Sequence, residues 1–134
     1  MSLEILQSEK EGVVILEAKG RLTVGPAATT LRDSLRTLAS AGNTKVVLNL
    51  AGVDYIDSTG LGSLVVCYTS LRKAGGGLRL LHVNRRNIEL LVLTKLATVF
   101  ELFDDEQSAV NSFFPNREIK RFDILSFVRE QSRD

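Results

Sequence analysis

Residues 45–62 read KVVLNLAGVDYIDSTGLG and place a strand, a loop and the start of a helix in succession. Residues 45–50 form a continuous apolar run that is too short for a helix and is β-branched at its start, which is typical of a strand covered on both faces. We expect a loop over residues 51–57 and then a helix that starts at Ser58 and ends at the glycines of residues 75–77. A buried strand that leads into such a helix predicts an α/β fold.

The flanking segments continue this alternation of strands and helices. An apolar start at residues 3–6, a polar turn and a β-branched run at residues 13–20 predict an opening hairpin. The other expected elements are a helix from Pro26 to about Gly42, strands at 78–83 and 99–103, a helix capped by Asn84 and a helix at 104–114. The fold class is therefore α/β, with a mixed β-sheet made of an opening hairpin plus parallel strands, joined by right-handed crossovers and covered by about four helices.

Residues 116–134 follow Pro115 and mix apolar with charged side chains. We expect this segment to form a helix that docks either on the domain or on a partner, because an undocked helix would expose a broad apolar face. The predicted organisation is one domain at residues 1–115 and a C-terminal extension at residues 116–134. Three roles stay open for the extension: a second contact with a partner, a dimer interface and a regulatory flap.

The composition is that of one ordinary soluble domain. The 134 residues are 44% hydrophobic and 25% charged, and 17 basic against 16 acidic side chains leave a net charge of +1. This balance argues against a dedicated nucleic-acid binder. No apolar stretch approaches the roughly 20 residues that span a bilayer, so we expect no membrane insertion. One cysteine excludes an internal disulfide framework, and we expect a cytoplasmic protein with no direct contact to nucleic acid.

The residues most informative about function lie at the expected helix start. Asp57 or Ser58 can cap the helix by accepting a hydrogen bond from a backbone N–H in its first turn, and Gly60 and Gly62 keep that turn narrow. The simplest interpretation is a capped helix with small residues for close packing. A second interpretation starts from the helix dipole, which favours an anion at the first turn. A phosphoryl group on Ser58 would add about 1.5 to 2 negative charges there without disturbing the core.

Three segments together resemble the STAS domain family, and more narrowly its bacterial anti-sigma factor antagonists. They are Val47-Leu48-Asn49-Leu50, Asp57-Ser58-Thr59-Gly60-Leu61-Gly62, and the turn Gly75-Gly76-Gly77 before a strand. The resemblance covers residues 3–114. It implies that the unphosphorylated antagonist binds a kinase-type anti-sigma factor and frees the sigma factor, and that phosphorylation of the serine matching Ser58 ends this binding. The implied partners are an anti-sigma factor serine kinase and a phosphoserine phosphatase of the metal-dependent type, and no cofactor is implied.

The resemblance assigns roles to residues around the helix start. Ser58 is the expected phosphorylation site, with Thr59 beside it as a second candidate acceptor. The expected partner-binding residues are Thr23, Asp57, Ser58, Thr59, Gly60, Leu61 and Gly62. At Thr23 the chain departs from the family, whose members often carry an acidic residue at this position, and the departure weakens the inference that a kinase docks there.

Two other classes of function stay open. In one, the chain is a STAS scaffold or transporter-associated subunit that docks a permanent partner through the same helix tip and is never phosphorylated. In the other, the helix start binds a small anionic ligand. A homodimer is compatible with each of these functions.

The sequence offers few candidate residues for a catalytic site or a metal-binding site. His82 is the only histidine and falls in an expected strand, so we expect neither a histidine-based catalytic site nor a metal site. Cys67 is expected to be a small residue in the core or at its boundary. The pair Arg85-Arg86 is typical of a solvated face, and the alternative is contact with a phosphate or an acidic surface. We therefore expect no enzyme activity.

Overall fold

The centre of the computed structural model, which describes residues 3–133, is a five-stranded sheet in the order β1-β2-β3-β4-β5. β1 pairs antiparallel with β2, and the other neighbouring strands pair in parallel. The strands are β1 Glu4–Lys10, β2 Val13–Leu22, β3 Lys45–Ile56, β4 Gly77–Leu81 and β5 Glu101–Phe103. The helices are α1 Pro26–Ser40, α2 Ser58–Lys73, α3 Arg85–Leu93, α4 Glu106–Asn111 and α5 Ile124–Arg133, with a short 3₁₀ helix, η1, at Leu96–Thr98. The predicted α/β class, with its opening hairpin and parallel strands, is confirmed.

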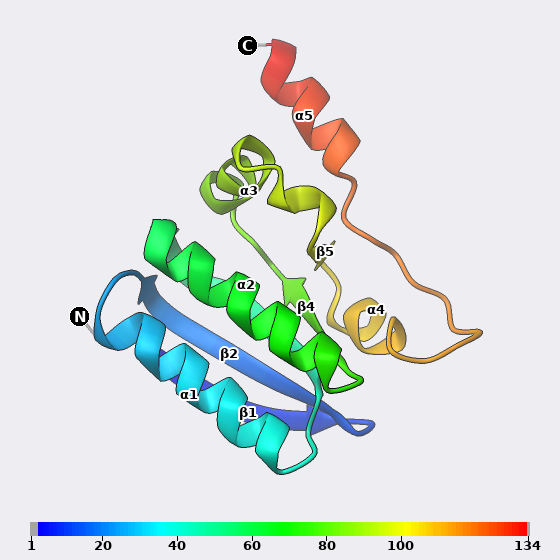
Figure 1. Ribbon diagram of the computed structural model, residues 1–134. Helices are drawn as coiled ribbons and strands as arrows, with labels where there is room; N and C mark the ends of the chain where they lie inside the picture. Colours follow the sequence, from blue (N-terminus) through cyan, green and yellow to red (C-terminus); the bar gives the residue numbers. More distant parts are fainter. Residues whose placement is uncertain (1–2, 134) are drawn as a thin grey trace.

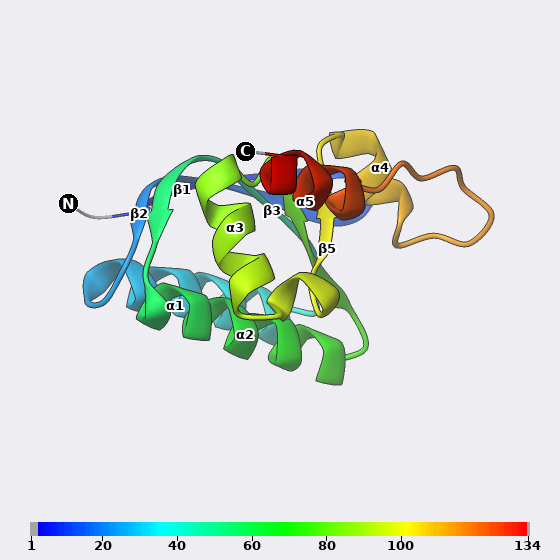
Figure 2. The ribbon, with the colours of Figure 1, turned by 90° about the horizontal axis from the view of Figure 1, so that it is seen from above.

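The helices divide between the two faces of the sheet (Figures 1 and 2). α1, α2 and α3 pack on one face, where Leu31, Leu64 and Leu91 belong to the main hydrophobic core. On the other face, α4 contributes Ala109 and Val110 to a smaller core. A strand buried from both sides needs apolar residues on both faces, which explains the uninterrupted apolar run of β3. None of the helices within residues 3–133 is long and apolar enough to cross a membrane.

The predicted loop at residues 51–57 is wrong, because β3 continues as a strand through Ile56. β4 leaves β3 after the pair Asn49↔Leu81, whereas β2 stays paired with β3 as far as Leu22↔Ile56. The second half of β3 is therefore an arm held by β2 on one side only. The sequence of this arm contains a glycine and an aspartate, which weaken a strand pattern, and long-range pairing with β2 overrides them.

On the side of this arm that β4 leaves unpaired, two asparagine side chains donate hydrogen bonds to its backbone. The side-chain amides of Asn84 and Asn87 both donate to the backbone carbonyl oxygen of Val53, each at 3.1 Å. Asn87 is almost fully buried, and these bonds satisfy backbone and side-chain groups that would otherwise be desolvated without partners. They also fix the first turn of α3 against β3.

The ends of several other elements differ from the expectation. β1 runs to Lys10 rather than to residue 6, because its full length pairs with β2. His82 was expected inside a strand, but it lies just after β4 and takes a left-handed φ of 56°. The expected helix at residues 104–114 is confined to Glu106–Asn111, with Asp105 as its cap.

The C-terminal extension packs on the domain at the free edge of the sheet. The backbone N–H of Phe122 donates to the carbonyl oxygen of Leu102 in β5 at 3.0 Å. Phe122, Ile124 and Phe127 are half-buried against the main core. α5 extends away from the sheet (Figure 1), and its Leu125 is 69% exposed. The segment was expected to dock either on the domain or on a partner, and these three side chains dock on the domain.

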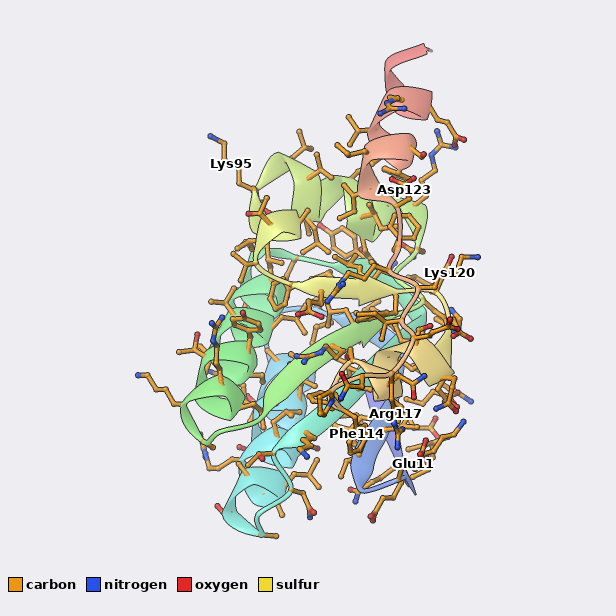
Figure 3. The ribbon with its side chains drawn as sticks, turned by 90° about the vertical axis from the view of Figure 1, so that its right-hand side faces the viewer. Glu11, Lys95, Phe114, Arg117, Lys120 and Asp123 are labelled. Atoms are coloured by element: carbon orange, nitrogen blue, oxygen red, sulfur yellow. The ribbon has the colours of Figure 1, made fainter. Side chains whose placement is uncertain are left out.

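A polar clamp ties the extension to the opening hairpin. Arg117 Nη1 donates to Glu11 Oε1 at 2.9 Å, and Gln107 Nε2 donates to Glu11 Oε2 at 3.0 Å. Figure 3 shows Arg117 and Glu11 side by side at the turn between β1 and β2. The hydrogen bond from Gln107, followed by that from Arg117, holds the pKa of the Glu11 carboxyl below its ordinary value. The extension therefore contacts both the turn after the first strand and the last strand of the sheet.

Candidate functional site

The first turns of α1, α2 and α3 lie together at one end of the sheet. Each helix follows one of the parallel strands β2, β3 and β4, and the carboxyl ends of parallel strands meet at the same edge. The connections that leave these strands carry Thr23, Ser58 and Arg86 to that edge. The two connections that hold the expected site residues thus lie at one end of the sheet, where α1 and α2 begin (Figure 1).

Asp57 is the residue that holds this end together. It precedes α2 in an extended conformation and caps the helix, with Oδ1 accepting from the Gly60 N–H at 2.8 Å. Oδ2 accepts from the backbone N–H of Val24 at 2.9 Å, and the Asp57 N–H donates to the Leu22 carbonyl oxygen at 3.2 Å. The hydrogen bonds from Gly60 and then Val24 hold the pKa of the Asp57 carboxyl below its ordinary value. Both carboxylate oxygens are therefore used structurally.

The capping role of Asp57 leaves the neighbouring hydroxyl groups free. Ser58 occupies the first position of α2 and is exposed, as is Thr59. Within the part of the chain that the structure describes, neither hydroxyl makes a hydrogen bond. The sequence left open whether Asp57 or Ser58 is the cap, and the structure assigns the cap to Asp57. The Ser58 hydroxyl therefore stands in solvent beside the N–H groups of the first turn.

The two glycines of the motif have different surroundings. A Cβ atom on Gly60 would lie 2.0 Å from the carbonyl oxygen of Leu22, so the close approach of α2 to the end of β2 requires glycine. A Cβ on Gly62 would meet nothing within 4 Å. Close packing of α2 on β2 therefore explains why residue 60 is glycine. Gly62 is exposed, and packing does not require a glycine there.

Leu61 and Thr23 lie differently with respect to the surface. Leu61 was expected among the partner-binding residues, and its side chain is only 7% exposed because it belongs to the main core. Thr23 is half-buried in the connection between β2 and α1. The next residue, Val24, is the one linked to the site: its N–H donates to Asp57 Oδ2, and the residue is 69% exposed.

A groove runs from Ser58 along the space between α2 and α3. It has a volume of about 290 Å³, and its lining includes Tyr55, Ser58, Leu61, Arg86 and Leu93. The Leu93 side chain is 81% exposed. The groove thus joins the exposed hydroxyl to an apolar rim on α3.

The structure separates the two arginines that the sequence presented as a pair. Arg86 lines the groove, and its guanidinium carbon lies 4.7 Å from the centroid of the Tyr55 ring. Arg85 does not line this groove and forms an ion pair with Glu89 at 3.7 Å. Sequence reasoning did not single out Val24 or Leu93. An apolar residue in a connection after a strand, and one off the buried face of a short helix, are the signals that could have found them.

The described residues hold no group of three or more histidine, cysteine, aspartate or glutamate side chains that could bind a metal ion. Cys67 is buried, and burial raises the pKa of its thiol to about 11. A thiol with so high a pKa is a poor nucleophile at neutral pH. His82 is exposed on the bend after β4. The exposed Ser58 hydroxyl lines the groove, whereas the Cys67 thiol is buried and the exposed His82 does not line this groove.

The sequence matches the STAS domain over residues 4–109. The chain belongs to the STAS domain family. The anti-sigma-B factor antagonist of Bacillus subtilis is 29% identical over 110 residues, which is 82% of this chain and 99% of that protein. The crystal structure of TM1081 from Thermotoga maritima matches with a TM-score of 0.76 and 25% identity, over 81% of this chain and 93% of its own. SpoIIAA of Bacillus, solved in its phosphorylated form, has the same fold, with a TM-score of 0.64 and 18% identity over 81% of this chain and 98% of its own.

Proposed function

We propose that this STAS domain is an anti-sigma factor antagonist controlled by phosphorylation of Ser58. In its unphosphorylated form it binds a kinase-type anti-sigma factor, and the sigma factor is freed. The observation that carries the proposal is the position of the Ser58 hydroxyl, which is exposed at the start of α2 and makes no hydrogen bond to the described residues, because Asp57 supplies the cap. The names of the relatives, which are anti-sigma factor antagonists, support the same role.

The covalent step is a transfer of one phosphoryl group. The partner kinase transfers the γ-phosphoryl group of ATP to Ser58 Oγ; the new O–P bond forms as the bond to ADP breaks, and the hydroxyl proton is released. A metal-dependent phosphatase hydrolyses the ester, which returns the hydroxyl and inorganic phosphate. The STAS domain is the substrate of both enzymes and has no catalytic role of its own.

The fold tolerates the modification where it is placed. The helix dipole and the N–H groups of the first turn favour a negative charge at the start of α2. Ser58 is exposed, so the added oxygens replace no core contact. We therefore expect phosphorylation to change recognition and to leave the fold intact.

The binding energy comes from the surroundings of Ser58. Val24, beside the Asp57 cap, and Leu93, in the lining of the groove, are strongly exposed apolar residues, and the exposed Gly62 has no side chain to obstruct a partner. A partner that packs over this surface excludes water from the hydroxyl. A phosphoryl group at the same place would then have to be desolvated, at a cost of several kcal/mol unless a cation of the partner meets it.

An affinity pull-down from the native host tests the proposal. The baits are the wild type, Ser58→Ala, Ser58→Glu and, as a control with the same charge change elsewhere on α2, Thr69→Glu; Thr69 is exposed. We expect an ATPase of the histidine-kinase-like type to be recovered by the wild type, Ser58→Ala and Thr69→Glu, and to be lost with Ser58→Glu. Equal recovery by Ser58→Glu would contradict the switch.

The pull-down and a thermal-shift measurement separate the other functions. Recovery of one large assembly or a transporter by all four baits, without any effect of ATP, would indicate a scaffold or transporter-associated subunit. A rise in melting temperature with a phosphate-bearing small molecule alone would indicate an anionic-ligand site. The cytoplasmic location and a homodimer stay predictions, which cell fractionation and light scattering would check.

A further inference from the structure

The groove between α2 and α3 brings a cation to the site of phosphorylation. Ser58 and Arg86 line the same groove of about 290 Å³, one from the first turn of each helix. They are 28 positions apart in sequence. They line one groove because β3 and β4 are neighbouring parallel strands, so the helices that follow these strands start side by side.

The Arg86 guanidinium is held in position but keeps its donors free. The guanidinium carbon lies over the Tyr55 ring at 4.7 Å from the centroid, and this cation–π contact uses the face of the ring while the guanidinium N–H donors stay available to other partners. Within the described residues, Arg86 has no ion pair and no hydrogen bond. The stacking limits the rotamers of the side chain, so less conformational entropy is lost when an anion binds.

The acidic side chains of the groove do not compete for this cation. Glu89 lines the groove and forms an ion pair with Arg85 at 3.7 Å. Asp57 also lines it, and its two carboxylate oxygens accept from the Gly60 and Val24 N–H groups. A phosphoryl group on Ser58 would be repelled by the adjacent Asp57 carboxylate and attracted by the unpaired Arg86.

The geometry points to Arg86 as the residue that binds the phosphoryl group of phosphorylated Ser58 within the same molecule. The inference rests on the proposed function for the modification itself and adds how the modified state is held. Guanidinium and phosphoryl groups match as bidentate partners. The contact draws the phosphoryl group into the α2–α3 groove, so phosphorylation occupies part of the groove and makes the Arg86 guanidinium unavailable to a partner.

The test uses the full chain with phosphoserine incorporated at position 58 during synthesis, so it does not depend on any kinase. The second pKa of the phosphoserine is measured by ³¹P NMR titration in this protein and with Arg86→Gln. The control is Arg85→Gln, which removes the same charge from the neighbouring position. Circular dichroism and urea unfolding of the unphosphorylated variants establish that each one folds.

We expect Arg86→Gln to raise the phosphoserine pKa by about half a unit, a roughly threefold change in the acid dissociation constant, because a nearby cation favours the dianion. Arg85→Gln should raise it by less than about 0.2 units, and Arg86→Lys should fall between wild type and Arg86→Gln because it keeps the charge without the bidentate edge. Equal shifts from Arg86→Gln and Arg85→Gln, or no shift from either, would overturn the inference. Since the phosphoryl group is supplied in synthesis, failure to find a kinase in the pull-down bears on the proposed function alone.

Discussion

Asp57 Oδ2 accepts a hydrogen bond at 2.9 Å from the backbone N–H of Val24, which lies 33 positions earlier in the chain. Its other oxygen caps α2 through the Gly60 N–H at 2.8 Å. One carboxylate thus joins the loop after β2 to the helix that carries Ser58. The exposed Val24 side chain and the Ser58 hydroxyl are held as one surface by a residue whose two carboxylate oxygens both bond within the domain.

Replacing Asp57 should therefore affect both segments. We expect Asp57→Ala to lower the free energy of unfolding by about 1–2 kcal/mol, the usual cost of a lost N-cap, and to speed hydrogen exchange of the Val24 amide. Urea denaturation and exchange measured by NMR check the two effects. Asp54→Ala is the control, because Asp54 is exposed in β3 and its side chain caps no helix. A loss of stability with an unchanged Val24 amide would contradict the link between the loop and α2.

The same carboxylate predicts how stability depends on pH. Its pKa in the folded protein is lowered from 3.8, first by the Gly60 N–H and then by that of Val24, so the folded state favours the ionised form. The stabilisation is complete above the unfolded value, and it is lost as the pH falls below about 4 through the folded pKa. The difference in stability between wild type and Asp57→Asn should therefore be larger at pH 7 than at pH 3. Urea unfolding at both pH values measures it, and a difference that grows on acidification would show that the sign is wrong.

The two glycines of the motif should respond oppositely to alanine. Gly60→Ala forces a methyl group against the Leu22 carbonyl oxygen and should cost about 1–3 kcal/mol, as overpacking does. Gly62→Ala meets no atom and should raise the free energy of unfolding by up to about 1 kcal/mol, because alanine is the better helix former. Thermal unfolding of Gly60→Ala, Gly62→Ala and the wild type measures both changes in stability. Equal destabilisation by both would mean that α2 does not approach β2 as described.

Phe122 should anchor the C-terminal extension. Its N–H bonds to Leu102, and its ring packs 6.1 Å from that of Phe127. We expect Phe122→Ala to raise the hydrogen-exchange rates of amides in α5 roughly tenfold or more, which corresponds to a loss of about 1.4 kcal/mol in local stability. Leu125→Ala, at a position that is 69% exposed, should leave these rates close to those of the wild type. Unchanged exchange in Phe122→Ala would show that α5 is held by other contacts.

The sequence was most informative where local pattern and tertiary structure agree. The apolar run before Ala51 and the helical spacing after Ser58 predict β3 and α2, because a central strand and a packed helix each need that pattern. The resemblance carried by residues 57–62 led to the right family, since this segment combines a cap, a hydroxyl and a glycine that packing requires.

The sequence was least informative where distant residues decide the outcome. The continuation of β3 depends on pairing with β2 and on Asn84 and Asn87, and no local pattern reveals such partners. The bond from Val24 to Asp57 and the stacking of Arg86 on Tyr55 are likewise long-range. Leu61 was expected to bind a partner because it belongs to the motif, and the sequence did not reveal that its side chain is buried in the core.

The most direct test of the central claim is a binding titration with the kinase recovered from the host. Wild type and protein with phosphoserine at position 58 are titrated by calorimetry, and mass spectrometry maps the phosphoryl group after incubation of the wild type, Ser58→Ala and Thr59→Ala with the kinase and ATP. The account predicts one phosphoryl group on Ser58, none on Ser58→Ala, and a loss of affinity of at least a hundredfold for the phosphorylated form, about 2.7 kcal/mol. Phosphorylation at another residue, or equal affinity of the two forms, would contradict it.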